Sequence, residues 1–311
     1  MKNKVEFEQV IACGCGIDVH KSLLVASIRG TGIKEETREY GAFTEDIESL
    51  RDWLKEHNIT HIALESTGVY WKPVFNILES DFEIILVNAR HIKNVPGHKT
   101  DKKDSRWITK LLLSGLLKGS FIPKLPIREL RDLTRYKKKL IEQISSEKNR
   151  IQKILEDGNI KLSSVVSNMS GVVATKIIDD LIAGEEDITK LVLHRHGKMQ
   201  ASEADLAKSL VGNLTAHHRF LLQIIKKSIK EKEMLIAELD LRIDEHLKAN
   251  ELELDRDLLS TIPGVGKDGA TCILAEIGND IETFVDEQHL SSWAGMSPGN
   301  NESAGKKKVP A

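Results

Sequence analysis

The chain has 311 residues, enough for about two domains, and its 30% charged and 40% hydrophobic fractions are typical of a globular protein. The formal net charge of −2 gives no sign of a nucleic-acid partner, although such footprints are local. Three cysteines without a C-x-x-C pair support neither a disulfide framework nor a zinc module. No signal peptide or bilayer-length apolar run is found, so we expect a cytoplasmic protein without a membrane partner.

Residues 1–122 alternate between strand and helix patterns. Residues 10–20, 22–30 and 35–43 predict three strands of an antiparallel meander, joined by tight turns at Gly30 and Gly32. The elements expected next alternate between helix and strand, and lie at 44–58 (with Thr44 as N-cap), 60–66, 69–80, 82–89 and 100–119 (with Thr100 as cap and Gly119 as stop). The order β-β-β-α-β-α-β-α is the one expected of an RNase H-like fold.

Four acidic residues fall at the ends of these elements. Asp18 ends the first predicted strand and Glu65 ends the fourth, where open α/β sheets form their sites. Asp101 and Asp104 are three residues apart at the start of the last helix, so they share a face. The fold would bring all four carboxylates together, and because like charges repel, bound Mg²⁺ would relieve the cost. Two such ions can clamp the attacking and leaving oxygens of a phosphodiester.

Each acid also has a structural interpretation, as a turn residue or as a partner of the helix dipole. Their joint placement favours the catalytic one. Basic residues gather before and along the last helix of this region: Arg90, His91, Lys93, His98, Lys99, Lys102, Lys103, Arg106 and Lys110. A basic rim around an acidic centre suits nucleic acid held over metal ions, and the alternative is a solvated charged face.

Three segments, "GIDVHK" (16–21), "ALESTGVYW" (63–71) and "KTDKKDSRW" (99–107), resemble the acidic blocks of the DEDD transposases of the insertion sequence 110 family. Asp18, Glu65, Asp101 and Asp104 match the family's tetrad without substitution. The resemblance implies a RuvC-like catalytic domain of RNase H fold over 1–122, with the four acids as catalytic and metal-binding residues. It also implies a transposase that recombines DNA.

The middle of the chain, 123–250, reads as helical. Apolar residues recur at three- and four-residue spacing in 128–157 and again in 218–247, which predicts a coiled-coil arm or helix pair, within one chain or between chains. We expect an irregular insert with shorter helices at 158–217. Basic residues at the start of the first helix suit a nucleic-acid backbone or a solubilising face equally: Arg128, Arg131, Arg135 and Lys137 to Lys139. The resemblance implies a linker that helps dimerisation and contacts nucleic acid.

The third segment, 251–311, opens with "IPGVGK" (262–267) before a helix, which predicts a helix-hairpin-helix element. Gly264 and Gly266 allow a close backbone approach, and the free amides at Lys267 can bind a phosphate without reading sequence. The alternative is an ordinary Gly-rich turn. We expect a small α-helical domain here, and the resemblance implies that it is the family's C-terminal transposase domain.

The block "LSSWAGMSPGNNESAGKKK" (290–308) matches the family segment that holds a nucleophilic serine, and the matching residue is Ser303. The resemblance implies that Ser303 attacks a phosphodiester, that a phosphoserine–DNA link forms, and that Lys306 and Lys307 neutralise phosphates. Without the resemblance Ser303 would be a turn residue. The family continues past this block and the sequence stops at Ala311, so we expect the domain to be C-terminally truncated and residues 299–308 to be poorly anchored.

The resemblance further implies a homo-oligomer, dimer or tetramer, that acts on element ends and target DNA under direction of a structured guide RNA. Two other functions fit the residues: a RuvC-like structure-specific nuclease in which water attacks, and an inactive DNA-binding fragment. A protein–DNA adduct that requires Ser303 would distinguish the first, and binding without cleavage would indicate the second.

Overall fold

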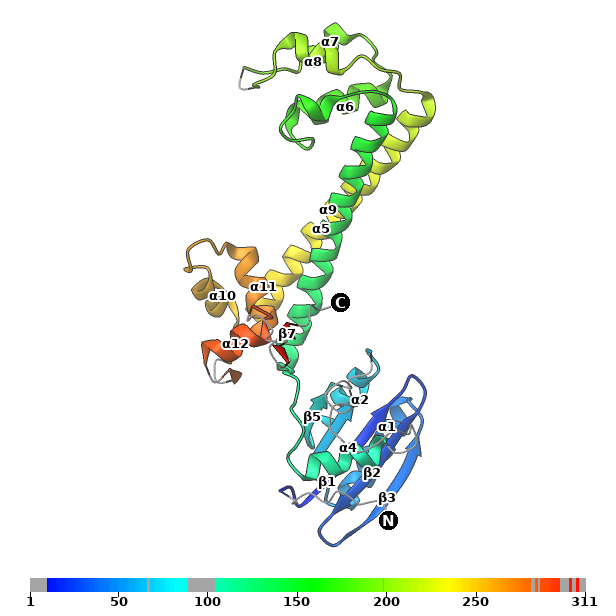
Figure 1. The fold of residues 1–311 in the computed structure, drawn as a ribbon, viewed down its shortest axis with the longest axis vertical. Coiled ribbons are helices and arrows are strands. Elements are labelled where there is room, and N and C mark those ends of the chain that lie inside the picture. Colours follow the sequence, from blue (N-terminus) through cyan, green and yellow to red (C-terminus); the bar gives the residue numbers. More distant parts are fainter. Residues whose placement is uncertain are drawn as a thin grey trace. The chain divides into compact units, whose positions relative to one another are not determined.

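The computed structural model describes residues 10–65, 68–88, 104–197, 199–280, 283–284 and 286–296, together with the backbone of 302–303 and 306–307. The chain forms two compact units, residues 1–122 and 123–311. The first unit is a sheet with helices and the second is almost entirely helical (Figure 1). None of the described helices is long and apolar enough to cross a membrane.

A five-stranded mixed sheet organises the first unit. Its strands are β1 (Cys13–Val19), β2 (Leu24–Gly30), β3 (Ile33–Tyr40), β4 (His61–Glu65) and β5 (Glu83–Val87). They lie in the order β3-β2-β1-β4-β5, in which β1, β2 and β3 form an antiparallel meander. Strands β4 and β5 run parallel to β1. The predicted strands are therefore confirmed to within a few residues at each end.

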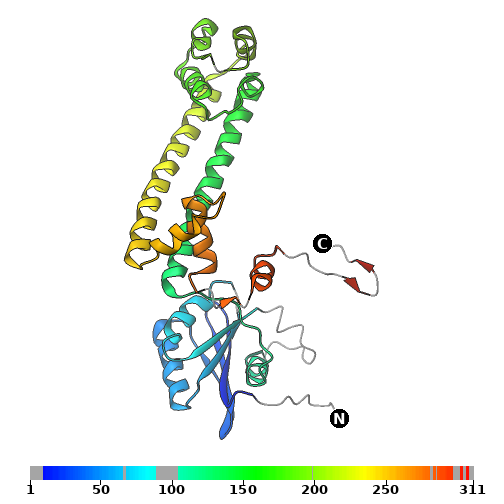
Figure 2. The ribbon, with the colours of Figure 1, turned by 90° about the vertical axis from the view of Figure 1, so that its left-hand side faces the viewer.

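Helices cover both faces of this sheet (Figures 1 and 2). Helices α1 (Thr44–Glu56) and α2 (Trp71–Leu78) pack on one face, where Ile17, Leu50 and Leu64 belong to the main apolar core. Helix α4 (Asp104–Leu113) packs on the other, where Ala63 and Ile108 form a smaller core. Because side chains alternate along a strand, alternate residues of β1 and β4 face α4.

Two helix boundaries differ from the prediction. Phe43, not Thr44, is the N-cap of α1, because the Asp46 carboxylate accepts a hydrogen bond from the Phe43 N–H at 3.1 Å. Helix α4 ends at Leu113 rather than near Gly119, because Gly115 adopts a φ of +65° and turns the chain. The sequence contains both glycines, and the first one ends the helix. Thr100 lies outside the described residues.

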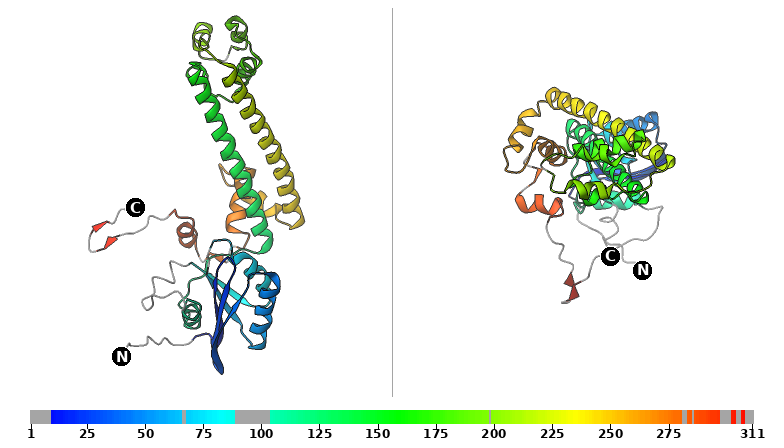
Figure 3. Two further views of the ribbon diagram at one scale, coloured as in Figure 1. Left: turned by 90° about the vertical axis from the view of Figure 1, so that its right-hand side faces the viewer. Right: turned by 90° about the horizontal axis from the view of Figure 1, so that it is seen from above.

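The second unit is built on an antiparallel helical hairpin, α5 (Leu125–Asp157) and α9 (Ala216–Ala249) (Figure 3). Near its base Ile127 packs with Ile243 and Leu247, and at its far end His218 of α9 lies 3.0 Å from Asp157 of α5. Proline in the first turn of α5 suits a helix start, and the Thr215 hydroxyl caps α9 by accepting from the His218 N–H. The sequence left open whether the two helices pair within a chain or between chains, and here they pair within one.

The insert between the long helices is a compact head rather than an irregular segment. It contains a 3₁₀ turn (Leu162–Ser164), α6 (Val172–Ala183), α7 (Ile188–Val192) and α8 (Glu203–Ser209). Ile177, Leu206 and Leu222 are fully buried in a core that the head shares with the ends of α5 and α9. Short helices with single apolar faces are hard to recognise in a sequence, because only their mutual packing stabilises them.

The helices described after the hairpin are α10 (Glu253–Leu259), α11 (Lys267–Ile277) and α12 (Glu287–Trp293). Leu274 of α11 is buried in a core that includes Ile127 and Leu247, and Ala270 of the same helix is also fully buried. Beyond them, only the backbones of β6 (Glu302–Ser303) and β7 (Lys306–Lys307) are described, as an antiparallel pair.

Candidate active site

Two of the predicted catalytic acids lie side by side on the sheet. Ile17 of β1 pairs with Leu64 of β4 in parallel register, so the next residues, Asp18 and Glu65, are neighbours at the carboxyl ends of adjacent strands. Both face α4, because Gly16 and Ala63 two residues earlier lie against that helix. Asp18 is 6% exposed and Glu65 is half-buried.

The start of α4 lies at the same edge of the sheet. A Cβ atom added at Gly16 would be 2.5 Å from the Ser105 carbonyl oxygen and 2.4 Å from the Thr109 amide nitrogen, so the helix backbone rests directly on β1. Farther back along the strand, Gly14 faces Leu112. The helix therefore runs antiparallel to β1, and its first residue, Asp104, is at the end that carries Asp18 and Glu65.

Hydroxyl groups fix this contact between helix and sheet. Thr109 Oγ1 accepts from the Gly16 N–H at 2.9 Å and lies 2.8 Å from the Ser27 carbonyl and 2.7 Å from the Ser105 carbonyl. Ser27 Oγ is 2.8 Å from both Ser105 Oγ and Thr37 Oγ1. Ser27, Ser105 and Thr109 are all buried, and each finds partners, so the helix is held in one register on the strand.

One residue that the sequence did not single out contacts an acid of the site. His20 Nε2 lies 3.1 Å from Asp18 Oδ2, and the imidazole is exposed while the carboxylate is buried. The signal in the sequence was the i, i+2 spacing of "DVH", which places both side chains on one side of an extended chain. His20 can orient the Asp18 carboxylate through this hydrogen bond.

The remaining predicted residues of this region divide into two groups. Asp101, Lys99, Lys102 and Lys103 lie outside the described residues. Arg106 is described: its Nε donates to Thr37 Oγ1 at 2.9 Å and lies 3.7 Å from Glu35 Oε1. More than half of its side chain remains exposed, so it lies on the rim of the edge that bears Asp104.

The donor set at this edge consists of oxygen atoms, the ligands that hard divalent cations prefer. Among the described residues, no group of three or more His, Cys, Asp and Glu side chains is placed to hold a metal ion. Asp101, the fourth predicted ligand, is not among those residues. Asp18, Glu65 and Asp104 bring carboxylate oxygens from three elements to one edge of the sheet.

In the C-terminal region, the described backbone pairs Ser303 with Lys306 and Glu302 with Lys307 in a short hairpin. The side chains of these residues and the expected poor anchoring of 299–308 lie outside what the structure describes.

Between α10 and α11 the chain turns at Gly264, whose φ is +87°. Gly266 caps α11 and Lys267 is its first residue, and a Cβ atom added at either glycine would meet nothing within 4 Å. The amides at this helix start are therefore approachable.

Two basic residues at the start of α5 bind another helix of the protein, α11, which neither interpretation of the sequence predicted. Arg131 donates to the carbonyls of Ala275 and Glu276 at 2.9 and 2.8 Å, which satisfies the C-terminal end of α11. Arg135 forms a two-pronged pair with the Glu276 carboxylate at 2.8 and 2.7 Å. These arginines hold α11 against α5, because a helix end and a carboxylate both need cationic donors.

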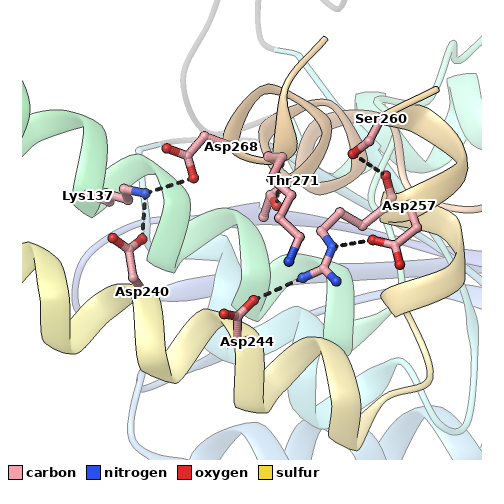
Figure 4. A network of polar contacts seen from close by, with 9 residues as sticks. Lys137, Asp240, Asp244, Asp257, Ser260, Asp268 and Thr271 are labelled. Atoms are coloured by element: carbon pink, nitrogen blue, oxygen red, sulfur yellow. Dashed lines mark hydrogen bonds and ion pairs between the residues drawn. The ribbon is translucent and has the colours of Figure 1, made fainter. Parts of the chain in front are cut away.

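A second group of ions holds the other end of α11 and the helix before it (Figure 4). Lys137 lies between Asp240 of α9 and Asp268 of α11, at 2.5 and 3.1 Å. Arg256 of α10 is 5% exposed and is paired with Asp244 at 2.9 Å and with Asp257 at 3.0 Å. A cavity of about 250 Å³ lies among these residues.

Several pKa values in these clusters are shifted. The hydrogen bond from Arg135 lowers the pKa of Glu276, and the same bond raises the pKa of Arg135. Burial lowers the pKa of Arg131 despite the nearby Glu276. Burial opposes the charge on Lys137, but its hydrogen bonds to Asp240 and Asp268 prevail and its pKa is raised. The hydrogen bonds of Glu276, Arg135 and Lys137 therefore favour the charged forms of these three side chains, whereas burial disfavours the charge of Arg131.

Two family models match the sequence and cover most of it. Residues 15–160 match the model of DEDD transposases of the IS110 type. Residues 256–310 match the model of the IS116/IS110/IS902 family of transposases. The first match contains Asp18, Glu65 and α4, and the second contains α11 and Ser303. No curated protein matches the chain significantly.

Proposed function

Because the chain belongs to the IS110 family of DEDD transposases, we propose that its carboxylate edge cleaves DNA strands with Mg²⁺ and that Ser303 is the nucleophile. The observation that carries the first part is the meeting of Asp18, Glu65 and the start of α4 at one edge of the sheet. Strand order β3-β2-β1-β4-β5 supports an RNase H-like, RuvC-like domain.

Asp18, Glu65, Asp101 and Asp104 would hold the metal ions at this edge. Bound Mg²⁺ supplies Lewis-acid stabilisation of the charge that develops on the phosphate oxygens. His20 keeps the Asp18 carboxylate turned to the edge, and the hydroxyl contacts of Thr109 keep α4 at a fixed height above it. This preorganisation matters because displacing a catalytic group by about 1 Å can greatly reduce the reaction rate.

In the proposed step, the Ser303 oxygen forms a bond to the phosphorus of a DNA phosphodiester while the bond from phosphorus to a deoxyribose oxygen breaks. The serine proton is lost to a base and the departing oxygen gains a proton, so charge and atoms balance. A free serine hydroxyl is a weak nucleophile and needs this activation. The phosphoserine link conserves the energy of the broken bond for strand exchange. Support for the role of Ser303 comes from the family match to its segment.

DNA binding follows from membership of the family, and we propose the contacts. The turn at Gly264 and Gly266 with Lys267 would bind a phosphate through its open amides, as a helix-hairpin-helix does. Arg106 would contact the backbone at the acidic edge, with Lys99, Lys102 and Lys103. Lys306 and Lys307 would neutralise phosphates near Ser303. A structured guide RNA and a homo-oligomer, dimer or tetramer, complete the proposal.

The test is a cleavage assay with labelled duplexes that carry the ends of the DNA element encoding the chain, together with RNA transcribed from that element. We expect Asp18→Asn to reduce Mg²⁺-dependent cleavage by at least about a hundredfold, in line with the loss of a charge-stabilising group. Asp52→Asn, at an exposed position of α1, is the matched control and should cleave normally. Full activity of Asp18→Asn would contradict the proposal.

The role of Ser303 is tested separately by denaturing electrophoresis of the reaction. A covalent protein–DNA adduct should form with the unaltered chain and be absent with Ser303→Ala. Cleavage without any adduct, unaffected by Ser303→Ala, would indicate attack by water and a nuclease. DNA binding without cleavage by the unaltered chain would reject the catalytic proposal altogether.

A further inference from the structure

Helix α10 presents an apolar pair on its outer face. Leu254 and Leu258 are 82% and 69% exposed, and their i, i+4 spacing puts them on one side of the helix. At 100° per residue this side is opposite Arg256, the buried residue that anchors α10 to α9. The two leucines are therefore turned away from α9, the helix to which Arg256 anchors α10.

Acidic residues surround this leucine pair. Glu253 and Asp257 flank it on one side, Asp255 flanks it on the other, and Glu251 lies just before the helix. Asp257 is paired with Arg256, and Asp255 accepts from the Asn279 amide at 3.0 Å. Glu251 and Glu253 have no ion-pair partner within the part of the chain that the structure describes. The outer face of α10 is an apolar pair within an acidic frame.

A groove of the opposite character lies near the far end of the hairpin, between α5, α6 and α9. Its volume is about 600 Å³. Ile151, Ile178 and Ile229, with Met169, provide aliphatic walls, and the lining residues that the structure describes include no aromatic ring. Aliphatic walls suit aliphatic side chains, whereas nucleic-acid bases are usually stacked on aromatic ones. The groove therefore favours a protein segment as its occupant.

Lysines dominate the rim of this groove: Lys148, Lys226, Lys227 and Lys230. Lys226 is paired with Asp179, and Lys227 lies 4.0 Å from Glu231. Neither Lys148 nor Lys230 has an ion-pair partner among the described residues. Among the described residues, Glu233 is the one acidic side chain that lines the groove. Two unpaired lysines beside an aliphatic floor complement two unpaired glutamates beside two exposed leucines.

The two surfaces cannot meet within one chain. Asp244 and Glu233 both lie on α9. Arg256 fixes α10 beside Asp244, whereas the groove ends at Glu233, and the stretch of α9 between these two residues spans about 16 Å. We propose that α10 of one copy of the chain docks its Leu254–Leu258 face into the lysine-rimmed groove of a second copy.

Two copies of the chain can make this contact reciprocally. On α9, the groove residues 226, 230 and 233 and the residues 240 and 244 beside α10 and α11 follow one stripe of the helix, so both surfaces lie on the same side of the hairpin. Two hairpins placed antiparallel therefore exchange α10 helices reciprocally about a two-fold axis. A closed two-fold contact gives a dimer and not a filament.

The test measures self-association of the full chain by sedimentation velocity and light scattering. The Leu254→Ser/Leu258→Ser variant removes the apolar pair and should raise the dissociation constant about tenfold or more, because buried apolar anchors dominate interfaces. Leu193→Ser, which alters a leucine that is 81% exposed in the head, is the matched control and should leave the constant unchanged. Circular dichroism and thermal melting verify that each variant is folded.

A charge exchange gives the decisive result. Lys148→Glu/Lys230→Glu reverses the groove, and Glu251→Lys/Glu253→Lys reverses α10, so each variant alone should associate at least about tenfold more weakly. Mixed together, they should form a heterodimer in which both contacts again join opposite charges. Lys153→Glu, an exposed lysine on another side of α5, should not affect association.

Unchanged self-association in the leucine and charge variants, a monomeric unaltered chain at tens of micromolar, or no recovery on mixing would each overturn the inference. None of these outcomes depends on DNA cleavage, so they can be told apart from a failure of the proposed catalytic activity.

Discussion

Gly16 determines how close α4 comes to the acidic edge. The helix backbone at Ser105 and Thr109 lies where a side chain at this position would stand, and the Gly16 N–H is bound by the Thr109 hydroxyl. Asp18 is two residues further along the strand and on the same face. A residue with no catalytic group thus sets the distance between the acids of the strands and the acid of the helix.

We therefore expect Gly16→Ala to displace α4. The added methyl group would overlap backbone atoms, which cannot rotate away, so unfolding free energy should fall by about 1–3 kcal/mol or more. Thermal denaturation measures the change in stability. The cleavage assay should show a loss of activity larger than the fraction of unfolded protein would explain. Gly197→Ala, at a glycine with open space around it, should melt like the unaltered chain. An unshifted melting temperature in Gly16→Ala would contradict this account of the helix contact.

Helix α11 shows at the next scale how one element is held by its neighbours. Its N-terminal turn is bound through Asp268 to Lys137, and its C-terminal carbonyls are bound by Arg131. The Arg135–Glu276 pair adds a two-pronged contact. Helix α11, which precedes the segment of Ser303, is thereby fixed to α5, so the hairpin base and this helix behave as one body.

Glu276→Gln should weaken this attachment by about 1 kcal/mol, because an exposed two-pronged pair is worth little more. Since the pKa of Glu276 is lowered in the folded chain, the unfolded chain binds the proton at higher pH. The pair thus contributes fully above the ordinary glutamate pKa of about 4.3, and the contribution is lost as pH falls through the lowered value.

Urea unfolding at several pH values measures this difference. The stability gap between the unaltered chain and Glu276→Gln should be widest near neutral pH and close in acid. Glu142→Gln, which alters an exposed i, i+3 pair with Lys139, is the matched control and should show a smaller gap. A gap that widens toward low pH would refute the sign argued here.

At the scale of the whole molecule, the apolar cores separate by unit. Among the described residues, the sheet and helices α1, α2 and α4 contain two cores drawn only from residues below 123. The hairpin, its head and the C-terminal helices contain two more, drawn only from residues above it. Each unit can therefore bury its own apolar surface, which is the main favourable term in folding.

We expect residues 1–122 and 123–311, expressed separately, each to unfold cooperatively, with melting temperatures within about 5 °C of the corresponding transitions in the full chain. Differential scanning calorimetry of the two fragments and the full chain makes the comparison. A fragment 1–122 without a cooperative transition would show that its cores depend on the second unit.

The sequence by itself determined the elements of the first unit, their order and the two long helices. Strong period-two and period-3.6 patterns, with glycines and prolines at the breaks, are local signals that packing did not override. It also determined the positions of Asp18 and Glu65 at strand ends, since a strand end is a local property. Family membership, expected from the short acidic blocks, is confirmed by the matches over 15–160 and 256–310.

Only the tertiary structure decided the contacts between residues distant in the sequence. Arg131 and Arg135 look like any basic helix face until α11, more than 130 residues later, places its carbonyls beside them. The head over 158–214 has short, weak patterns that become helices because they share one core. The stop of α4 at Gly115 and the outward leucines of α10 depend likewise on what each segment packs against, and the local sequence does not encode that.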